Sequence, residues 1–403
     1  MLVYHSYRKN SSRPIKIAFI TDTYPPDVNG VAHSLYQIIQ ILKQHHEILV
    51  LRPEDDLIGI KIQPHIKEVF FPYLNLPFYK EVKLGLPFYQ RVYDSIKAFS
   101  PDVVHIVTEG PLGFMGLLVA RQLGITVVSD YRTNFTDYLK FYNIEFLSEF
   151  IKYYLIYFHN QCDLNFVPTR EIKIQLKKQG INNLKVLGRG VDIRNFHYSK
   201  YDEDFRKEWN VKKDDLLFLY VGRIALEKNL ELVCDVFRSL KKKYPFIHLM
   251  FVGDGPYRST LEQEYKEILF LGAKKKEELS KIYASSDLFL FPSKTETFGN
   301  VVLEAYASGL PIIAYSYAAS KLIYQHKKTG ILIPFHKKNS HEVWYQYLEQ
   351  LIKHPNRLKK LKMNIKNEYH KLKKFTWEGI SALLLKHYYE LLKQKRKKKI
   401  INL

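Results

Sequence analysis

Two glutamates that follow a strand-like run have the clearest capacity for chemistry. Glu296 lies in a loop after the apolar run 287–292, and Glu304 stands eight residues further along in a helical pattern. Glu304 is the single charged residue between Glu296 and Lys321, so burial there would require a hydrogen-bond donor. The hydroxyls of a ribose or a hexose are such donors. A solvent-facing Glu304 and a loop Glu296 are the alternative.

The start of the same helix offers a second kind of contact. We expect this helix to begin near Thr297 and to stop at Gly309. Backbone N–H groups in the first turn of a helix have no partner within it and favour an anion such as a phosphate. The amides concerned belong to Thr297, Phe298, Gly299 and Asn300.

Arg223 and Lys228 are a pair of cations after the strand-like run 216–222. A guanidinium grips phosphate oxygens with two N–H groups and an ammonium adds a point charge, so the pair suits a diphosphate. We expect Glu227 and Lys228 to open a helix. Because the chain has 62 Lys and Arg residues, an ordinary surface pair is the alternative.

Gly30 ends the loop TDTYPPDVNG at 21–30, which joins a strand-like run to a helical pattern. A glycine at a helix entrance lets a phosphate approach the backbone closely. The loop lacks the three-glycine spacing of a dinucleotide site, which argues against a nicotinamide enzyme.

Motifs for metal or nucleophilic chemistry are not found. Asp202, Glu203 and Asp204 have carboxylates at the spacing of a metal clamp, but they lie in a polar junction where solvated charge is expected. The sequence has no P-loop, no Gly-x-Ser-x-Gly elbow and no His-x-x-x-His pair. We therefore predict neither a metal nor another cofactor.

Short apolar runs alternate with helical patterns along the chain, and these elements must position the candidate side chains. The alternation is typical of a doubly wound parallel sheet in an α/β fold, and it restarts once, which predicts two such domains. Parallel sheets bind ligands at the carboxyl ends of their strands, so we expect the site in a cleft between the domains. The strand-like runs are 16–21, 46–51, 102–107, 125–129, 164–168 and 184–187, followed by 216–222, 247–253, 268–272, 287–292 and 311–315.

The predicted domain boundaries follow from this pattern. The N-terminal domain covers 1–195, the second domain covers 196–375, and a C-terminal segment covers 376–403. That segment has apolar residues at helical spacing from Trp377 to Leu391 and ends in a basic tail. A length of 403 residues exceeds what one ordinary core accommodates.

The net charge of +21 is concentrated near the C-terminus. The last 53 residues hold 16 Lys and Arg against 3 Glu. Such an excess attracts nucleic acid, an anionic membrane or a polyphosphate, or it is a solvated helix face. No apolar run reaches the roughly 18 residues of a membrane span and no signal peptide is visible, so we predict a cytoplasmic protein. Cys162 and Cys234 are expected to be buried and reduced.

Eight motifs in order give the chain a family resemblance. Together they resemble the family 4 retaining glycosyltransferases of the GT-B fold, most of all the bacterial GDP-mannose-dependent α-mannosyltransferases and related transferases that glycosylate lipids. The resemblance implies two facing Rossmann-like domains. The motifs are TDTYPPDVNGVAHS at 21–34, KLGLPFY at 83–89, PDVVHIVTEGPLG at 101–113, GRGVD at 188–192, VGRIALEKN at 221–229, VGDGP at 252–256, ETFGNVVLEAYASGLP at 296–311 and FTWE at 375–378.

The resemblance also implies roles for single residues. Glu304 is expected to bind the donor ribose, and Glu296 the hydroxyls of the transferred sugar. Arg223 and Lys228 match the pair that grips the diphosphate. The other donor contacts that it implies are the backbone of Thr297, Phe298, Gly299 and Asn300, Gly253 in VGDGP, and Gly30, which covers the phosphates from the N-terminal side.

One position departs from the family pattern. Many relatives have a histidine near the reacting sugar where this chain has Arg132. A guanidinium stays charged at neutral pH and cannot shuttle a proton. The remaining role for Arg132 is to orient a phosphate or an acceptor.

The implied reaction moves a mannose- or glucose-type hexose from GDP- or UDP-hexose to a hydroxyl of a lipid or growing glycan, with retention and without a metal. Negative charge grows on the leaving diphosphate, and cations and helix amides stabilise it. In the family's usual scheme the leaving phosphate deprotonates the acceptor. The candidate catalytic residues are Arg223, Lys228, Glu296 and Arg132.

Two other classes of function remain open. One is a sugar-nucleotide epimerase of the same architecture, and the other is a non-catalytic basic protein that binds nucleic acid. The isolated Glu304 and the paired cations favour the transferase, so no nucleic-acid partner is expected.

The acceptor side suggests a membrane. The sequence LPFY occurs at 76–79 and 86–89 with lysines between, and aromatic residues interleaved with cations suit a membrane interface. We expect peripheral contact with the anionic inner face of the membrane. An aromatic layer packed under a loop is the alternative.

Overall fold

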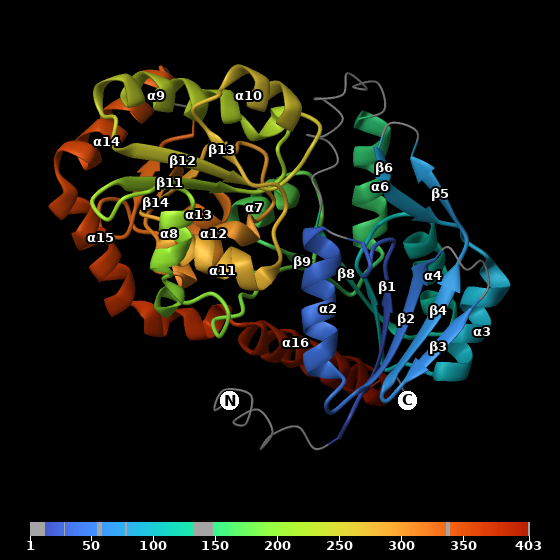
Figure 1. Cartoon of the computed structure of the whole chain (residues 1–403). Helices are drawn as coiled ribbons and strands as arrows, with labels where there is room; N and C mark the ends of the chain where they lie inside the picture. The colour runs from blue at the N-terminus through green and yellow to red at the C-terminus, as the bar shows by residue number, and fades with distance from the viewer. Residues whose placement is uncertain are drawn as a thin grey trace. The chain divides into compact units, whose positions relative to one another are not determined.

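A computed structural model describes residues 13–27, 29–54, 59–76, 79–132, 148–335 and 339–401. The chain divides into two compact units (Figure 1). Unit 1 consists of Met1–Gly190 together with Trp377–Leu403, and unit 2 consists of Val191–Thr376.

Unit 1 is built on an eight-stranded sheet in the order β10-β9-β8-β7-β1-β2-β4-β3. Its strands are parallel except for β3, which is antiparallel to β4. β5 and β6 form a separate antiparallel pair. The strands are β1 (Lys16–Ile20), β2 (Glu47–Pro53), β3 (Ile60–Gln63), β4 (Ile66–Phe71), β5 (Tyr73–Leu76), β6 (Tyr79–Gly85), β7 (Val103–Ile106), β8 (Thr126–Asp130), β9 (Leu164–Val167) and β10 (Leu184–Val186).

The central strand β1 shows why this sheet is covered on both faces. Its side chains alternate, so that Ile17 and Phe19 belong to one buried cluster while Ala18 and Ile20 belong to another. Helices α2 and α16 pack on the first face, and α3 and α4 supply the second cluster. The helices of unit 1 are α2 (Gly30–Leu42), α3 (Tyr89–Phe99), α4 (Pro111–Gln122), α6 (Ser148–Asn160), α7 (Arg170–Lys178) and α16 (Trp377–Ile401).

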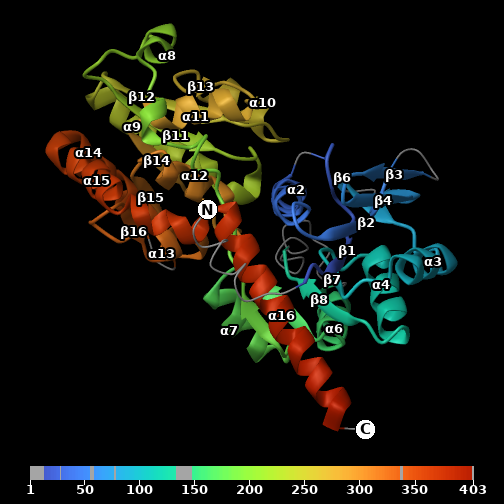
Figure 2. The same cartoon turned by 90° about the horizontal axis from the view of Figure 1, so that it is seen from below.

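Helix α16 returns the chain to unit 1 after unit 2 is complete, and it runs as one continuous helix to the C-terminal end (Figure 2). Trp377, Ile380, Leu384 and Tyr388 are buried on one stripe beside apolar residues of α2. The predicted amphipathic C-terminal helix is therefore confirmed.

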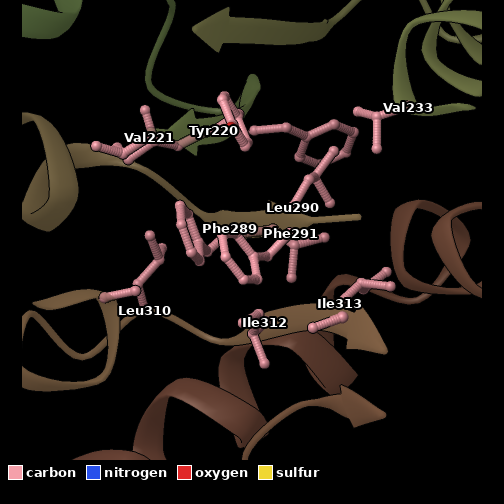
Figure 3. Packing of buried hydrophobic residues seen from close by; sticks show 14 of the residues in the cluster. Tyr220, Val221, Val233, Phe289, Leu290, Phe291, Leu310, Ile312 and Ile313 are labelled. Carbon is pink, nitrogen blue, oxygen red and sulfur yellow. The ribbon is translucent and has the colours of Figure 1, made fainter. Parts of the chain in front are cut away.

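Unit 2 has a fully parallel six-stranded sheet in the order β13-β12-β11-β14-β15-β16. Its core is a single cluster, in which Tyr220 on β11 and Phe289 on β14 lie among aliphatic side chains of neighbouring strands (Figure 3). The strands are β11 (Leu216–Val221), β12 (Ile247–Val252), β13 (Leu269–Phe270), β14 (Leu288–Phe291), β15 (Ile312–Tyr315) and β16 (Ile331–Ile333). The helices are α8 (Glu203–Glu208), α9 (Leu230–Lys243), α10 (Arg258–Glu264), α11 (Lys276–Ser285), α12 (Asn300–Ala307), α13 (Ala318–Ile323), α14 (Ser340–Lys353) and α15 (Pro355–Asn367), with 3-10 turns η2 (Tyr198–Lys200), η3 (Leu226–Lys228) and η4 (Tyr369–Phe375).

The eleven strand-like runs of the sequence all form strands, and two parallel-sheet units confirm the predicted α/β class. Two helix starts differ from the expectation. Helix α12 begins at Asn300 because Gly299 before it has φ +91°, and Lys228 ends a 3-10 turn because Asn229 at φ 56° separates that turn from α9. Strands β3 to β6 and β16 were not predicted. Cys162 and Cys234 are buried and form no disulfide.

Candidate active site

Two glycine loops meet at the carboxyl end of the sheet in unit 2. β11 and β12 are neighbouring parallel strands, and each is followed at once by a glycine with positive φ, Gly222 at +151° and Gly253 at +139°. A Cβ atom on Gly253 would lie 1.9 Å from the carbonyl oxygen of Gly222. Only glycine permits this approach, which fixes the loop that leads into Arg223.

The structure brings Lys228 and Glu296 together. Lys228 follows β11 and Glu296 follows the adjacent strand β14, and their Nζ and Oε1 atoms are 2.7 Å apart. The hydroxyl of Ser293 donates to the same Oε1 at 3.0 Å, and the backbone N–H of Glu296 donates to the Tyr317 hydroxyl. Both side chains of the ion pair are mostly buried, so the pair is held rigidly at the rim of the sheet.

Arg223 stands beside a carboxylate that the sequence reasoning did not select. The side chain of Arg223 is about one quarter exposed, and its Nη1 lies 3.7 Å from Oε1 of the buried Glu227. The Thr295 hydroxyl donates to the carbonyl of Glu227 at 3.1 Å, which ties the Lys228 loop to the Glu296 loop. Because residues 223–225 are not helical, the spacing of four between Arg223 and Glu227 did not by itself predict this pair.

Glu304 is half-buried on α12 and has a tyrosine as its hydrogen-bond donor. The Tyr283 hydroxyl, on α11, donates to Oε2 of Glu304 at 3.1 Å. Burial raises the pKa of Glu304 to about 7, although this hydrogen bond and the charge of Lys276 oppose the rise. The need for a donor was predicted, but Tyr283 lies 21 residues away and could not be identified from spacing.

The segment before α12 is arranged around Phe298. Its ring is buried, and its carbonyl accepts the backbone N–H of Ala319 at 2.9 Å. Gly299 follows with φ +91°, so the backbone turns sharply between Thr297 and the first helical residue, Asn300. The predicted donor contacts from these four residues remain predictions.

Arg132 and Gly30 belong to unit 1, whereas the residues above belong to unit 2. Arg132 is buried after β8, where its Nε donates to Asp130 Oδ2 at 2.6 Å. Gly30 is exposed at the start of α2, and the side chain of Asn29 caps the next two amides, Val31 and Ala32, at 3.0 and 2.9 Å. Those two amides are therefore already engaged, and the predicted role of Gly30 over a phosphate remains a prediction.

Among the described residues, no three side chains of His, Cys, Asp or Glu are grouped closely enough to hold a metal ion. No helix in the described part of the chain has the length and apolarity needed to span a membrane.

The chain has two α/β units with parallel sheets, and the sheet of unit 2 is followed by cations and carboxylates at its strand ends. This arrangement is that of the GT-B class of glycosyltransferase folds. Solved structures agree with this class. The Anabaena protein HepE in complex with UDP matches with a TM-score of 0.75 over 93% of this chain and 100% of that one, at 18% identity.

Family models match both units. The model "Glycosyltransferase Family 4" matches residues 28–195, and "Glycosyl transferases group 1" matches residues 202–368. A GDP-mannose-dependent alpha-mannosyltransferase of Mycobacterium tuberculosis is 30% identical over 79% of this chain and 84% of its own length. An alpha-monoglucosyldiacylglycerol synthase of Streptococcus pneumoniae is 25% identical over 85% of this chain and 79% of its own. The chain therefore belongs to the family 4 glycosyltransferases.

Proposed function

We propose that this protein transfers a mannose- or glucose-type hexose from a GDP- or UDP-hexose to a hydroxyl group of a lipid or glycan, with retention of the anomeric configuration and without a metal. The observation that carries the proposal is the convergence of Lys228, Glu296 and Arg223 at the carboxyl ends of two adjacent strands. The names of the two curated relatives, one acting with GDP-mannose and one making a glucosyl lipid, support the donor and acceptor classes.

The cations are proposed to stabilise the leaving diphosphate. As the bond between sugar and phosphate breaks, the sugar ring gains positive character and the diphosphate gains negative charge. Arg223 and Lys228 are fixed before the reaction, so they stabilise the growing charge without reorganisation. The deprotonation of the acceptor by the leaving phosphate belongs to the proposal.

The carboxylates are proposed to read the donor. Glu296 accepts hydroxyls of the transferred sugar, and its contact with Lys228 places that sugar next to the cation that holds the phosphate. Glu304 accepts the two hydroxyls of the donor ribose in place of, or in addition to, the hydroxyl of Tyr283. Further donor contacts are proposed from the backbone of Thr297 to Asn300, which follows β14, and from Gly253, which follows β12.

The proposal is tested by product analysis. The protein is incubated with GDP-mannose, GDP-glucose, UDP-glucose and a membrane lipid extract, with and without a chelator. We expect a glycosylated lipid or glycan with an α linkage, visible by NMR, in equal yield with the chelator. A product with an inverted linkage, a loss of activity with the chelator, or release of an epimerised sugar without acceptor product would contradict the respective part of the proposal.

We further propose that unit 1 contacts an anionic membrane surface. Three aromatic side chains on α6, spaced three and four residues apart, are more than half exposed: Phe150, Tyr153 and Tyr157. Phe88 and Tyr89 of the second LPFY sequence are also about half exposed, so they do not form a packed layer. The side chains of the first LPFY sequence lie outside the described residues. Exposed aromatic residues together with the net positive charge suit the interface of an anionic bilayer.

A further inference from the structure

Arg189 is a buried arginine for which the described part of the chain supplies no hydrogen bond and no ion pair. It lies three residues after β10, only 6% of its surface is exposed, and its guanidinium forms neither a hydrogen bond nor an ion pair within the part of the chain that the structure describes. A buried charge without a partner is destabilising by several kcal/mol, so such a group is expected to have a function.

Two other buried arginines show how this chain treats a structural guanidinium. Arg206 is 4% exposed and donates to a carboxylate, Asp287, and to three backbone carbonyls at 2.8 to 3.0 Å. Arg52 binds two carboxylates, Glu54 and Glu68. Arg189 has comparable burial and none of these contacts.

The surroundings of Arg189 are positive. Arg132, a second cation nearby, is also buried, and it already binds the carboxylate of Asp130. Asp130 also lies 3.3 Å from Nε2 of His105. Burial opposes the ionisation of Asp130, but Arg132, His105 and Arg189 outweigh it and hold the pKa of Asp130 well below its usual range. Both guanidiniums therefore lie near Asp130, but of the two only Arg132 is bonded to it.

Arg189 remains charged at neutral pH. Burial and the charge of Arg132 lower the pKa of Arg189 to about 9, with Asp130 opposing them. The local excess of positive charge is thus present under physiological conditions.

Arg132 and Arg189 also share an edge of the sheet. Arg132 follows β8 and Arg189 follows β10, and both strands are parallel to β9 between them. Both arginines therefore lie beyond carboxyl ends of strands, the edge at which parallel α/β sheets bind ligands.

We propose that Arg132 and Arg189 form a binding site for the phosphate ester group of a substrate. Guanidiniums match phosphate oxygens in geometry and charge, and a bound phosphate supplies the anion that Arg189 lacks. This proposal rests on the proposed transferase function for the identity of the substrate. Either a phosphorylated acceptor or the donor, with its diphosphate, would bring a phosphate group to the site.

The test is thermal unfolding of the full chain. The parent protein carries Arg223→Ala and Lys228→Ala, which remove the two cations proposed to bind the donor diphosphate, and the variant carries Arg189→Met in addition. Without phosphate, we expect Arg189→Met to leave the melting temperature unchanged or to raise it, since an unpaired buried charge is removed. We expect inorganic phosphate to raise the melting temperature of the parent protein, which keeps Arg189, and to cause no such rise in Arg189→Met.

Two further variants keep the test decisive. Arg189→Lys, made in the same Arg223→Ala, Lys228→Ala protein, keeps the charge and is expected to retain part of the phosphate-dependent rise. Arg238→Met removes an equal charge on α9, where Arg238 pairs with Glu267, and is expected to leave the rise intact. The inference is overturned if phosphate stabilises Arg189→Met as much as its parent, or if Arg189→Met lowers the melting temperature without phosphate.

Two ligands distinguish the source of the phosphate. If it belongs to the acceptor, glycerol 3-phosphate stabilises the unchanged chain but not Arg189→Met, and GDP stabilises both equally. If it belongs to the donor, GDP loses part of its effect in Arg189→Met and glycerol 3-phosphate has none. These readouts do not require turnover, so a failed transfer assay leaves this test valid.

Discussion

Lys228 and Glu296 neutralise each other at 2.7 Å in the free protein. Under the proposed function, an incoming diphosphate would compete with Glu296 for the ammonium, while Glu296 would gain the sugar hydroxyls as new donors. Because the two side chains are in direct contact, we expect the effects of replacing them to be non-additive.

The first prediction concerns Lys228→Ala. Loss of one electrostatic contact to the leaving group is expected to lower turnover by roughly two to three orders of magnitude. Steady-state rates of donor consumption measure it. The matched control is Lys243→Ala, because Lys243 pairs with Glu349 at the same distance of 2.7 Å on an exposed surface and is expected to keep full activity. Unchanged turnover in Lys228→Ala would remove the diphosphate role.

The second prediction concerns pH and Glu304. Because the pKa of Glu304 is raised from 4.5 to about 7, the folded protein holds a proton that the unfolded chain has released between these values, and Glu304 destabilises the folded state as pH rises through this window. Ribose hydroxyls favour the ionised carboxylate, so nucleotide binding releases this proton. Affinity for GDP or UDP should therefore increase from pH 6 to pH 8.

Glu304→Gln separates this effect from the titration of the nucleotide itself. The amide has no charge to lose, so the pH dependence that remains in this variant belongs to the diphosphate. Isothermal titration of both proteins at several pH values measures the difference. Identical pH profiles would show that Glu304 does not meet the ribose.

At the scale of elements, the close contact between the loops after β11 and β12 fixes the backbone that leads into Arg223. Gly253→Ala introduces a Cβ 1.9 Å from the Gly222 carbonyl at φ +139° and is expected to destabilise the fold by about 2 kcal/mol or more. Urea unfolding measures the change. Gly180→Ala is the matched control, because φ is also positive there at +96° but no atom lies within 4 Å of the added carbon. Equal losses in the two variants would show that the loop contact is unimportant.

The elements that the sequence predicted are the ones with strong local signals. β1 and β11 are continuous apolar runs, and the residues of α2 have helical periodicity, so local pattern and burial agree. β16 has only three residues, and β3 has four residues of which the first three are exposed, so neither carries an apolar pattern of sufficient length. Helix α12 begins later than expected because the positive φ of Gly299 precedes it, and hydrophobic spacing does not reveal a backbone angle.

The candidate site was predictable as a set of residues but not as a network. Sequence order was enough to select Arg223, Lys228 and Glu296 in loops that follow strands, and Glu304 on the helix after β14. That Lys228 pairs with Glu296 depends on β11 and β14 being neighbours, which joins residues 68 positions apart. That Arg189 has no ion pair among the described residues is likewise visible only once the fold shows which carboxylates are near.

At the scale of the whole molecule, the proposed membrane contact gives the fourth prediction. The protein should sediment with vesicles of phosphatidylglycerol and phosphatidylcholine at low salt and less so at high salt, since ions screen the attraction. Replacement of Phe150, Tyr153 and Tyr157 by Ser should weaken this binding.

The control for that experiment changes exposed apolar residues elsewhere in unit 1. Ile60→Ser with Ile62→Ser alters strand β3, where both side chains are more than half exposed, and should leave sedimentation unchanged. Equal binding by the triple α6 variant and the original protein would contradict the role of α6.

Unit 2 is inserted into unit 1, because the chain leaves unit 1 after Gly190 and re-enters it at Trp377. The two crossing segments are bonded to each other, with the N–H of Val191 donating to the carbonyl of Phe375 at 2.8 Å and a β-bridge between Val191 and Thr376. Unit 2 can therefore be excised as one uninterrupted gene segment whose new ends lie next to each other. Unit 1 would instead have to be spliced from two fragments, and the same adjacency means that a short linker should suffice to rejoin them.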